Sequence, residues 1–369
     1  MNKKFIVLSL IGVFISVAAL YFAFRYVPMA DLLRYMGTIE PIWIVLSLVL
    51  CLITFYFRIQ RWRLILGEKY HLSFWDAYHP IMIGFMANYI LPSRMGEIVR
   101  PMILKKNDNV PFSTGLATVT LERIFDLMFM LLFLTVCLTR MEIDDSLSIP
   151  FGDYILNKGT LGTISRGMLC LLLFLLAGVV TLAFSLSRNI IQAMVIRIPA
   201  LFFFLSQDIR DKMGQKICKP VNSLIDNFSV GLSQIRDLKS LFGSLFFSAA
   251  VWVFSALSYY VMTFGSPGVD MTFQEAFTAM IIICAVIALP SVPGYWGVWE
   301  AAGFFALSIF GISGEVAAGF TLVNHAVQII PIILLGFISL FVTGDNLFSL
   351  QKRALYRTQT KINSNSKVN

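Results

Sequence analysis

Charged residues are scarce in this chain of 369 residues. Asp, Glu, Lys and Arg make up 14% of it, whereas 57% is hydrophobic; soluble domains carry about 25% charged residues. The mean hydropathy is +0.78, and several apolar runs reach the roughly 20 residues that a bilayer-spanning helix needs. The composition therefore excludes a soluble globular domain and predicts an all-α polytopic membrane protein.

The chain also lacks the residue patterns that common cofactors require. Its five cysteines show no paired spacing, which argues against disulfides and against a metal site. A Walker A motif for nucleotide binding is absent from the sequence. The net charge of +8 does not indicate nucleic acid, because Lys and Arg fall mainly in loops between apolar segments. We therefore predict no catalytic residue, no metal, no cofactor and no nucleic-acid partner.

Apolar segments and loop charges divide the chain into five parts. These are an N-terminal transmembrane helix with an outer loop (1–40), a first repeat (41–187), a basic amphipathic linker (188–240), a second repeat (241–343) and a disordered tail (344–369). Basic loops are expected in the cytoplasm, and the acidic loop at 141–158 is expected outside. The prediction is a multi-pass protein of the inner (plasma) membrane with both termini in the cytoplasm. The linker fits helices that lie on the inner leaflet or a solvated connector equally well.

Two segments do not fit a simple crossing from one side of the membrane to the other. The segment 74–104 starts and ends beside basic loops, so it must turn back inside the membrane. The segment 272–312 behaves in the same way from the other side. We predict about six full transmembrane helices and two re-entrant helical hairpins, at 74–104 and 272–312. The residues assigned to the breaks are Pro92, Gly96, Pro293, Gly294 and Gly297.

The two hairpins have similar sequences. Ser73-Phe-Trp-Asp precedes Leu91-Pro-Ser in the first, and Thr272-Phe-Gln-Glu precedes Leu289-Pro-Ser in the second. Gly- and Pro-interrupted apolar segments at matching places in two inverted halves are typical of the central site of a transporter. We therefore predict an inverted pseudo-repeat; the alternative is a chance match between aromatic-rich apolar segments.

Ionisable residues gather around the first break. Irregular backbone at membrane depth persists only where protein or a wet cavity surrounds it, and intramembrane charges indicate function. We expect Arg123 to pair with Asp126 at i, i+3, and Glu122 to take Arg94 or Arg100 as its cation. Three arginines beside a helix N-terminus suit a phosphate; the alternative is an ion-pair cluster that only fixes the hairpin. The predicted substrate-binding residues are Arg94, Glu97, Arg100, Glu122, Arg123, Asp126 and Glu300.

A few further residues have two open interpretations. Glu300 is expected to face the first cluster across a pseudo-twofold axis. Tyr295 and its neighbouring tryptophans fit an interfacial aromatic belt or the cavity wall equally well. His325 is expected to be a hydrogen-bonded packing residue, with a proton relay as the alternative. Arg58 and Arg61 lie at a helix end and are expected to extend to the membrane interface.

The motifs around the breaks resemble a known family. Asn88-Tyr-Ile-Leu-Pro-Ser-Arg-Met-Gly-Glu-Ile-Val-Arg, Ala117-Thr-Val-Thr-Leu-Glu-Arg-Ile-Phe-Asp and Pro293-Gly-Tyr-Trp-Gly-Val-Trp-Glu are similar to the lysylphosphatidylglycerol synthase transmembrane-region family. The resemblance extends over about residues 10–340. The third motif departs from the family pattern Pro-Gly-x-Gly-Gly-x-Arg-Glu, since Trp299 stands where Arg is usual. The resemblance identifies a stand-alone member without the synthase domain.

The resemblance implies a flippase-like protein that moves an anionic or modified phospholipid, or a lipid-linked glycan, between leaflets. The expected partner is a membrane lipid with an anionic headgroup or of the polyprenyl-phosphate type. A homo-oligomer and a separate lipid-modifying enzyme are further candidate partners. Two other functions stay open, namely an intramembrane lipid-modifying enzyme and a non-catalytic membrane scaffold.

Overall fold

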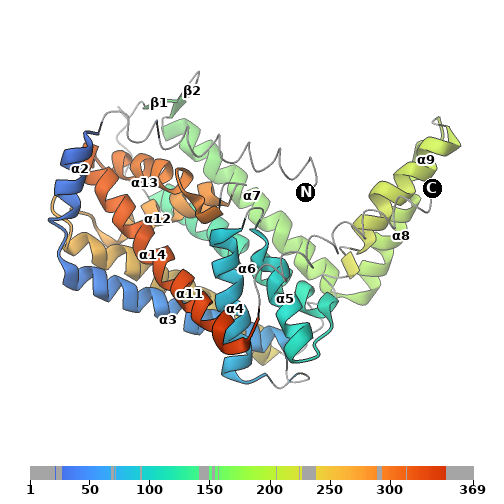
Figure 1. Ribbon diagram of the computed structural model, residues 1–369. Helices are drawn as coiled ribbons and strands as arrows, with labels where there is room; N and C mark the ends of the chain where they lie inside the picture. Colours follow the sequence, from blue (N-terminus) through green and yellow to red (C-terminus); the bar gives the residue numbers. More distant parts are fainter. Residues whose placement is uncertain are drawn as a thin grey trace.

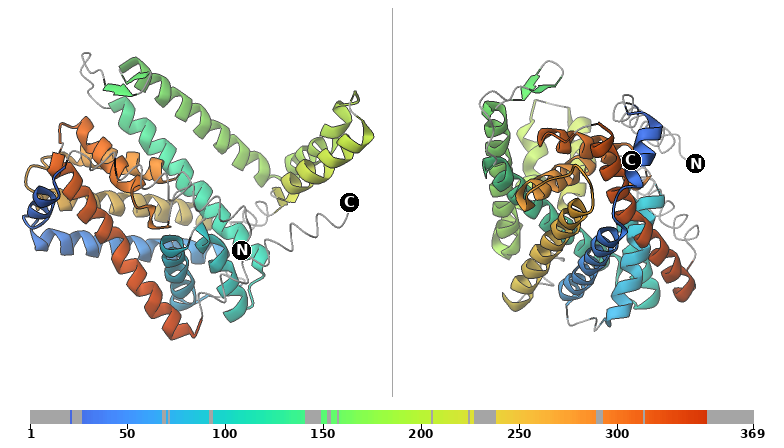
Figure 2. Two further views of the ribbon diagram at one scale, coloured as in Figure 1. Left: turned by 45° about the horizontal axis from the view of Figure 1, so that its top comes forward. Right: turned by 90° about the vertical axis from the view of Figure 1, so that its left-hand side faces the viewer.

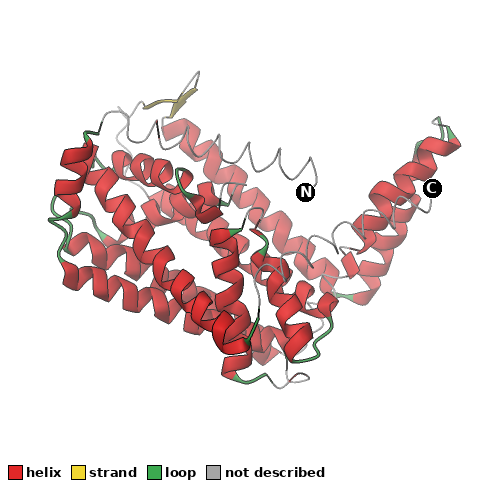
Figure 3. Ribbon diagram, viewed as in Figure 1, coloured by secondary structure: helices red, strands yellow, loops and turns green. Residues whose placement is uncertain are grey.

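The residues that the structure describes are almost entirely helical, as the sequence predicts, apart from two short paired strands between the long helices that end at Arg140 and begin at Lys158 (Figures 1 and 3). The computed structural model describes residues 21, 27–67, 70, 72–91, 94–140, 149–151, 154–156, 158–204, 206–223, 225–226, 238–288, 293–312 and 314–345. The described helices are α2 (Met29–Met36), α3 (Pro41–Leu66), α4 (Phe74–Ile90), α5 (Gly96–Asn107), α6 (Phe112–Arg140), α7 (Lys158–Ala183), α8 (Ser185–Leu201), α9 (Gln207–Met213), the π-helical turn η3 (Gly214–Cys218), α11 (Leu238–Phe264), α12 (Phe273–Ile287), the 3₁₀ turn η4 (Pro293–Tyr295), α13 (Val298–Ile309) and α14 (Gly314–Thr343). Strands β1 (Ile149–Phe151) and β2 (Tyr154–Leu156) pair antiparallel.

Four of the described helices, α3, α7, α11 and α14, are long and apolar enough to cross a membrane. Helix α6 has 29 residues and is therefore also long enough, at about 1.5 Å of rise per residue. However, it carries the Glu122, Arg123 and Asp126 side chains. The expected first transmembrane helix and the C-terminal tail lie almost wholly outside the described residues. The chain is thus a multi-pass membrane protein, and six full crossings stay a prediction.

Helices α3 and α11 form an antiparallel pair that runs along one side of the molecule (Figure 1). The backbone N–H of Glu40 donates to the carbonyl of Gly265 at 2.9 Å, so the start of α3 lies beside the end of α11. In the middle of the pair, the Ser47 and Ser258 hydroxyls each donate to the other residue's carbonyl, at 2.7 and 2.8 Å. Small polar residues of this kind let two apolar helices approach closely.

Two helical hairpins extend from opposite ends of this pair. The first consists of α4 and α5 and follows the end of α3; the second consists of α12 and α13 and follows the end of α11. Since α3 and α11 are antiparallel, the hairpins start at opposite ends of the bundle. Helices α4 and α12 begin alike, with capping boxes formed by Ser73 with Asp76 and by Thr272 with Glu275. This likeness agrees with the predicted inverted repeat, which stays a prediction.

The tips of the two hairpins meet inside the bundle. The rings of Tyr89 and Tyr295 lie 6.0 Å apart, edge to face, and helix α4 contacts η4. Nη2 of Arg94, in the first hairpin, donates to the carbonyl of Ile287, in the second, at 2.6 Å. The backbone turns at Arg94 (φ 50°), Gly294 (φ 72°) and Gly297 (φ 85°), a region that L side chains adopt at a cost. Irregular backbone from both hairpins is therefore gathered in one place.

The predicted break residues are only partly turn residues. Pro293 and Gly294 lie in η4, and Gly297 is the N-cap of α13. Pro92 lies outside the described residues. Gly96 does not turn the chain but is the first residue of α5. A Cβ atom at Gly96 would lie 1.8 Å from the carbonyl oxygen of Gly84, so its role is to let α5 lie directly on α4.

Helix α14 crosses both hairpins and holds them together (Figure 1). It packs closely because three glycines stand at its contacts. A Cβ atom at Gly336 would meet Met86 of α4 at 2.4 Å, and one at Gly319 would meet Tyr35 of α2 at 2.4 Å. On α13, a Cβ atom at Gly303 would meet Thr321 of α14 at 2.3 Å. Helix α14 therefore fixes the first hairpin relative to the second.

Helices α8 (Ser185–Leu201) and α9 (Gln207–Met213), which cover the first part of the expected linker, form an arm beside the bundle. Helix α7 packs along α6, and α8 and α9 project from its end, away from the hairpins (Figure 2). Large apolar side chains on this arm are exposed, including Leu186, Met194, Phe203 and Phe204. Helices are present where the sequence predicts an amphipathic linker, and their contact with a leaflet stays a prediction.

We predict that Gly96→Ala lowers the thermal unfolding temperature of the detergent-solubilised protein. The added methyl group overlaps the α4 backbone, and overpacking of this kind costs about 1–3 kcal/mol. The matched control is Gly178→Ala on α7, where no heavy atom lies within 4 Å of the new Cβ and alanine favours the helix. An equal or higher unfolding temperature for Gly96→Ala would contradict the close contact.

Candidate functional site

A cavity of about 550 Å³ lies between the hairpin tips and the long helices. Its wall combines residues from α3, α4, the first turn of α5, α6, α11, α12, η4, α13 and α14. The polar and aromatic side chains that line it are Thr54, Phe55, Arg58, Phe85, Asn88, Tyr89, Arg94, Glu97, Arg123, Asp126, Trp252, Ser255, Tyr259, Cys284, Tyr295, Trp299, Asn324 and Gln328. Both hairpins thus contribute to one charged internal hollow.

Three arginines from three different elements line this cavity. Arg58 comes from α3, Arg94 from the first hairpin tip and Arg123 from α6. Arg123 Nη2 lies 3.0 Å and Arg58 Nη1 lies 3.8 Å from the same Asp126 oxygen. The Arg94 guanidinium lies over the Tyr295 ring, 5.7 Å from its centre. The Asp126 carboxylate, which Arg58 and Arg123 share, does not use all the N–H groups of these two arginines.

A second layer of ion pairs lies directly behind the arginine wall. Arg61, which is fully buried, places Nη1 2.6 Å from Asp126 Oδ1 and Nη2 3.3 Å from Glu122 Oε1. Its Nη1 also donates to the Ser248 hydroxyl of α11 at 3.0 Å. Arg100 of α5 completes the layer, with Nη2 2.7 Å from Glu122 Oε2. These contacts join α3, α5, α6 and α11 through the two acids of α6.

Two expected pairs are confirmed in this layer. Arg123 pairs with Asp126 at i, i+3, and Arg100 is the hairpin cation that Glu122 needs. Arg94, the other candidate, binds a backbone carbonyl of the second hairpin instead. Sequence analysis missed Arg61, which does not extend to the membrane interface because it is 0% exposed. No local pattern in the sequence identifies it, because Arg94, Arg100 and Arg123 already offer enough cations for the two carboxylates of α6.

Arg58 is also not at the interface, since its side chain is 20% exposed and lines the cavity. It lies one turn before Arg61 on α3, so both guanidinium groups reach the same region of α6. Glu97 lines the cavity from the first turn of α5. Among the described residues it makes no hydrogen bond or ion pair. It is therefore a carboxylate available to a ligand.

Glu300 lies apart from this constellation. One carboxylate oxygen accepts the Gly297 N–H at 2.6 Å and caps α13, and the other lies 2.5 Å from His325 Nδ1. Both residues are buried, and neither lines the cavity. Their neighbour Trp299 does line it and stacks on the His325 ring at 4.5 Å. Of the open interpretations, the structure favours a cavity role for Tyr295 and Trp299, whereas Trp296 is 40% exposed.

The cavity wall holds buried donors without a partner in the part of the chain that the structure describes. They are Nε of Arg58, Nε of Arg123, Nε1 of Trp252, the hydroxyl of Tyr259 and Nε1 of Trp299. Arginine and indole N–H groups can only donate, and a buried donor left unpaired is costly. These atoms are too buried for a ligand to reach, but the partly exposed guanidinium groups of Arg58 and Arg123 share a single Asp126 oxygen, so the cavity suits a ligand with acceptor oxygens.

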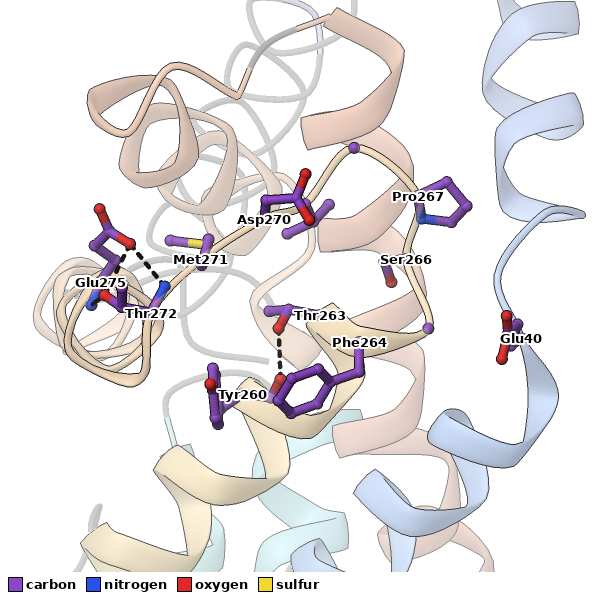
Figure 4. A pocket seen from close by; sticks show the side chains of 13 residues that line it. Glu40, Tyr260, Thr263, Phe264, Ser266, Pro267, Asp270, Met271, Thr272 and Glu275 are labelled. Atoms are coloured by element: carbon purple, nitrogen blue, oxygen red, sulfur yellow. Dashed lines mark hydrogen bonds between the residues drawn. The ribbon is translucent and has the colours of Figure 1, made fainter.

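A second hollow, of about 580 Å³, lies at the far end of the α3–α11 pair (Figure 4). It is formed by the loop between α11 and α12 and is lined by Glu40, Asp270 and Glu275, with no Lys or Arg in its lining. The Glu275 carboxylate is already used, since it accepts from the N–H and hydroxyl of Thr272 at 2.7 and 2.8 Å. The first cavity is therefore the candidate site. The described residues contain no group of three or more His, Cys, Asp or Glu that could hold a metal ion.

The fold and the cavity define a class: a multi-pass helical membrane protein with a charged internal hollow between two helical hairpins. The sequence matches the family model described as "lysylphosphatidylglycerol synthase TM region" over residues 9–336. The chain belongs to this family, as its hairpin motifs predict.

Comparison with curated proteins gives archaeal relatives. The chain is 23% identical to the glycosyltransferase AglD of Haloferax volcanii over 86% of its own length, and it spans about half (51%) of that relative. It is 24% identical to a UPF0104 membrane protein of Methanothermobacter thermautotrophicus, over 94% of the chain and 96% of the relative. A UPF0104 membrane protein of Methanocaldococcus jannaschii is also 24% identical, over 73% and 99%. No solved structure gives a significant match.

We predict that Arg61→Ala strongly destabilises the protein. It removes the one cation that contacts both Glu122 and Asp126, and breaking a buried ion pair from one side costs about 3–5 kcal/mol. The matched control is Arg34→Ala on α2, whose side chain is 81% exposed and 3.9 Å from Asp31; its cost should stay below about 1 kcal/mol. Thermal unfolding in detergent measures both. Similar shifts for the two variants would show that the buried layer does not hold the bundle together.

Proposed function

We propose that this protein moves an anionic lipid between the leaflets of the membrane and that the lipid headgroup passes through the central cavity. The observation that carries the proposal is the wall of three arginines from α3, α6 and the first hairpin tip, which face one hollow that both hairpins reach. A headgroup must be desolvated to cross a bilayer, and charge-assisted hydrogen bonds to guanidinium groups replace its water.

The arrangement of the hairpins supports passage as well as binding. They start at opposite ends of the α3–α11 pair, their tips are in contact, and residues of both line the cavity. The proposal is that they are re-entrant hairpins of an inverted repeat, a construction typical of transporters with a central site. A tip that moves would open the cavity on its own side while the other stays closed.

The outer surface of the bundle suits the acyl chains. Large apolar side chains are exposed on the long helices, for example Val49 on α3, Val253 on α11 and Phe337 on α14. Lipid tails can therefore stay in the bilayer beside these helices while the headgroup occupies the cavity. Under this proposal the protein lies in the inner (plasma) membrane with both termini in the cytoplasm, and the driving force is a gradient or the lipid concentration difference.

The family description, which names a lysylphosphatidylglycerol synthase region, supports lipid chemistry at the membrane, and the AglD name adds glycosyl transfer. AglD's name also supports a second candidate, an enzyme that modifies such a lipid. This candidate would use Glu97, the cavity carboxylate without a protein partner, as an acid or base. Transport is preferred because the arginine wall and the opposed hairpins serve binding and passage, whereas one carboxylate offers only part of a catalytic site.

We predict that Arg94→Gln and Arg123→Gln each abolish movement of a labelled anionic lipid in reconstituted liposomes, while the protein still inserts and unfolds at a near-normal temperature. Each variant removes a cation from the cavity wall. The matched control is Arg166→Gln on α7, an exposed arginine whose contacts are within its own helix. Wild-type rates in both cavity variants would refute transport through this cavity, and conversion of the lipid to a new species would identify the enzyme.

A further inference from the structure

The buried charges around the cavity do not balance. The wall and the layer behind it contain five arginines and three carboxylates, joined by direct ion pairs or by the shared lining. The arginines are Arg58, Arg61, Arg94, Arg100 and Arg123, and the acids are Glu97, Glu122 and Asp126. Arginine stays protonated in proteins, so two positive charges remain in excess when the carboxylates are ionised.

Neighbouring groups do not remove this excess. Glu300, the next acid toward the second hairpin, has both oxygens engaged by Gly297 N–H and His325 and lies outside the cavity lining. Helix α5 begins at Gly96, beside Arg94, and the partial positive charge of its N-terminus is offset by the partial negative charge of the C-terminus of α12, which ends at Ile287. One of its N–H groups is already satisfied, since Gly96 donates to Asn88 Oδ1 at 2.8 Å. The electrostatic potential in the cavity is therefore positive.

We infer that the ligand of this cavity is a lipid with a doubly charged phosphate headgroup, either a phosphate monoester or a diphosphate diester. This inference rests on the proposed function and specifies its substrate class. A buried charge is costly unless it is paired, and two negative charges are what the excess needs. A phosphodiester such as phosphatidylglycerol carries one, and an aminoacylated phosphatidylglycerol carries none or a net positive charge, so neither balances the cavity.

The positions of the arginines fit the same headgroup. Arg58, Arg94 and Arg123 reach the cavity from α3, the hairpin tip and α6, so they approach a central anion from different sides. Terminal phosphate oxygens accept several charge-assisted hydrogen bonds at once. The Arg58 and Arg123 side chains are 20% and 33% exposed and share one Asp126 oxygen, so their guanidinium groups keep N–H donors for a ligand. A phosphodiester such as that of phosphatidylglycerol has fewer non-bridging oxygens to accept these hydrogen bonds.

The test is a binding comparison on the purified full chain in detergent at pH 8, where a phosphate monoester carries close to two charges. The probes are a prenyl monophosphate, phosphatidylglycerol, lysyl-phosphatidylglycerol and water-soluble glycerol phosphate. We expect the prenyl monophosphate to bind at least tenfold more tightly than each of the others. Equal or tighter binding of phosphatidylglycerol or its lysyl ester would overturn the inference. Glycerol phosphate that binds as well as the prenyl ester would assign the cavity to a soluble phosphate and also overturn it.

Two variants change the charge balance in opposite directions. Arg58→Gln lowers the excess to one, and we expect the preference for monophosphate over phosphatidylglycerol to fall about tenfold. Glu97→Gln raises the excess to three, and we expect that preference to rise. A purely structural role would reduce binding of both lipids in both variants. Changes of the same sign in the two variants would contradict the charge argument.

Transport assays separate the two proposals. If phosphatidylglycerol moves across liposomes as fast as the prenyl monophosphate, the inference about headgroup charge is wrong and lipid transport stands. If the monophosphate binds with the expected preference and no lipid moves, the proposed transport is wrong and the headgroup assignment stands.

Discussion

The structure depends on the two carboxylates of α6, Glu122 and Asp126. They lie one turn apart in a largely apolar helix and repel each other unless cations lie close by. Arg61 from α3 contacts both, and Arg100 from α5 takes the remaining Glu122 oxygen. Since an unpaired buried charge is far more costly than a lost apolar contact, α3 and α5 must pack around α6 in this register. The ion pairs thus fix the first hairpin on the long helices.

The same constraint produces the cavity. The inner layer, with Arg61 and Arg100, uses up Glu122, so the outer cations share only Asp126. Arg94 lines the cavity and donates one N–H to the carbonyl end of α12, which connects the two hairpin tips. The inner layer thus pairs both of its arginines with Glu122, whereas in the cavity wall Arg58 and Arg123 share one Asp126 oxygen. The inner layer fits the structural alternative for the charged cluster, and the cavity wall is the part for which we propose headgroup binding.

Much of this could be predicted from sequence because local rules govern it. The helix ends, the capping boxes at Ser73 and Thr272, and the Arg123–Asp126 pair depend on residues only a few positions apart. The burial of Arg61 could not be predicted, because it depends on where α6 lies relative to α3, which local spacing does not define. Glu300 illustrates the same limit: its position suggested a role opposite the first cluster, and the fold places His325 of α14 against it instead.

The central claim is that an anionic headgroup occupies the hollow between the two hairpin tips. Cryo-electron microscopy of the protein in nanodiscs that contain a prenyl monophosphate tests it most directly. The account predicts phosphate density within hydrogen-bond distance of Arg58, Arg94 and Arg123, with both hairpin tips at mid-membrane depth. Acyl-chain density alone in the hollow, or hairpin tips at the membrane surface, would contradict it.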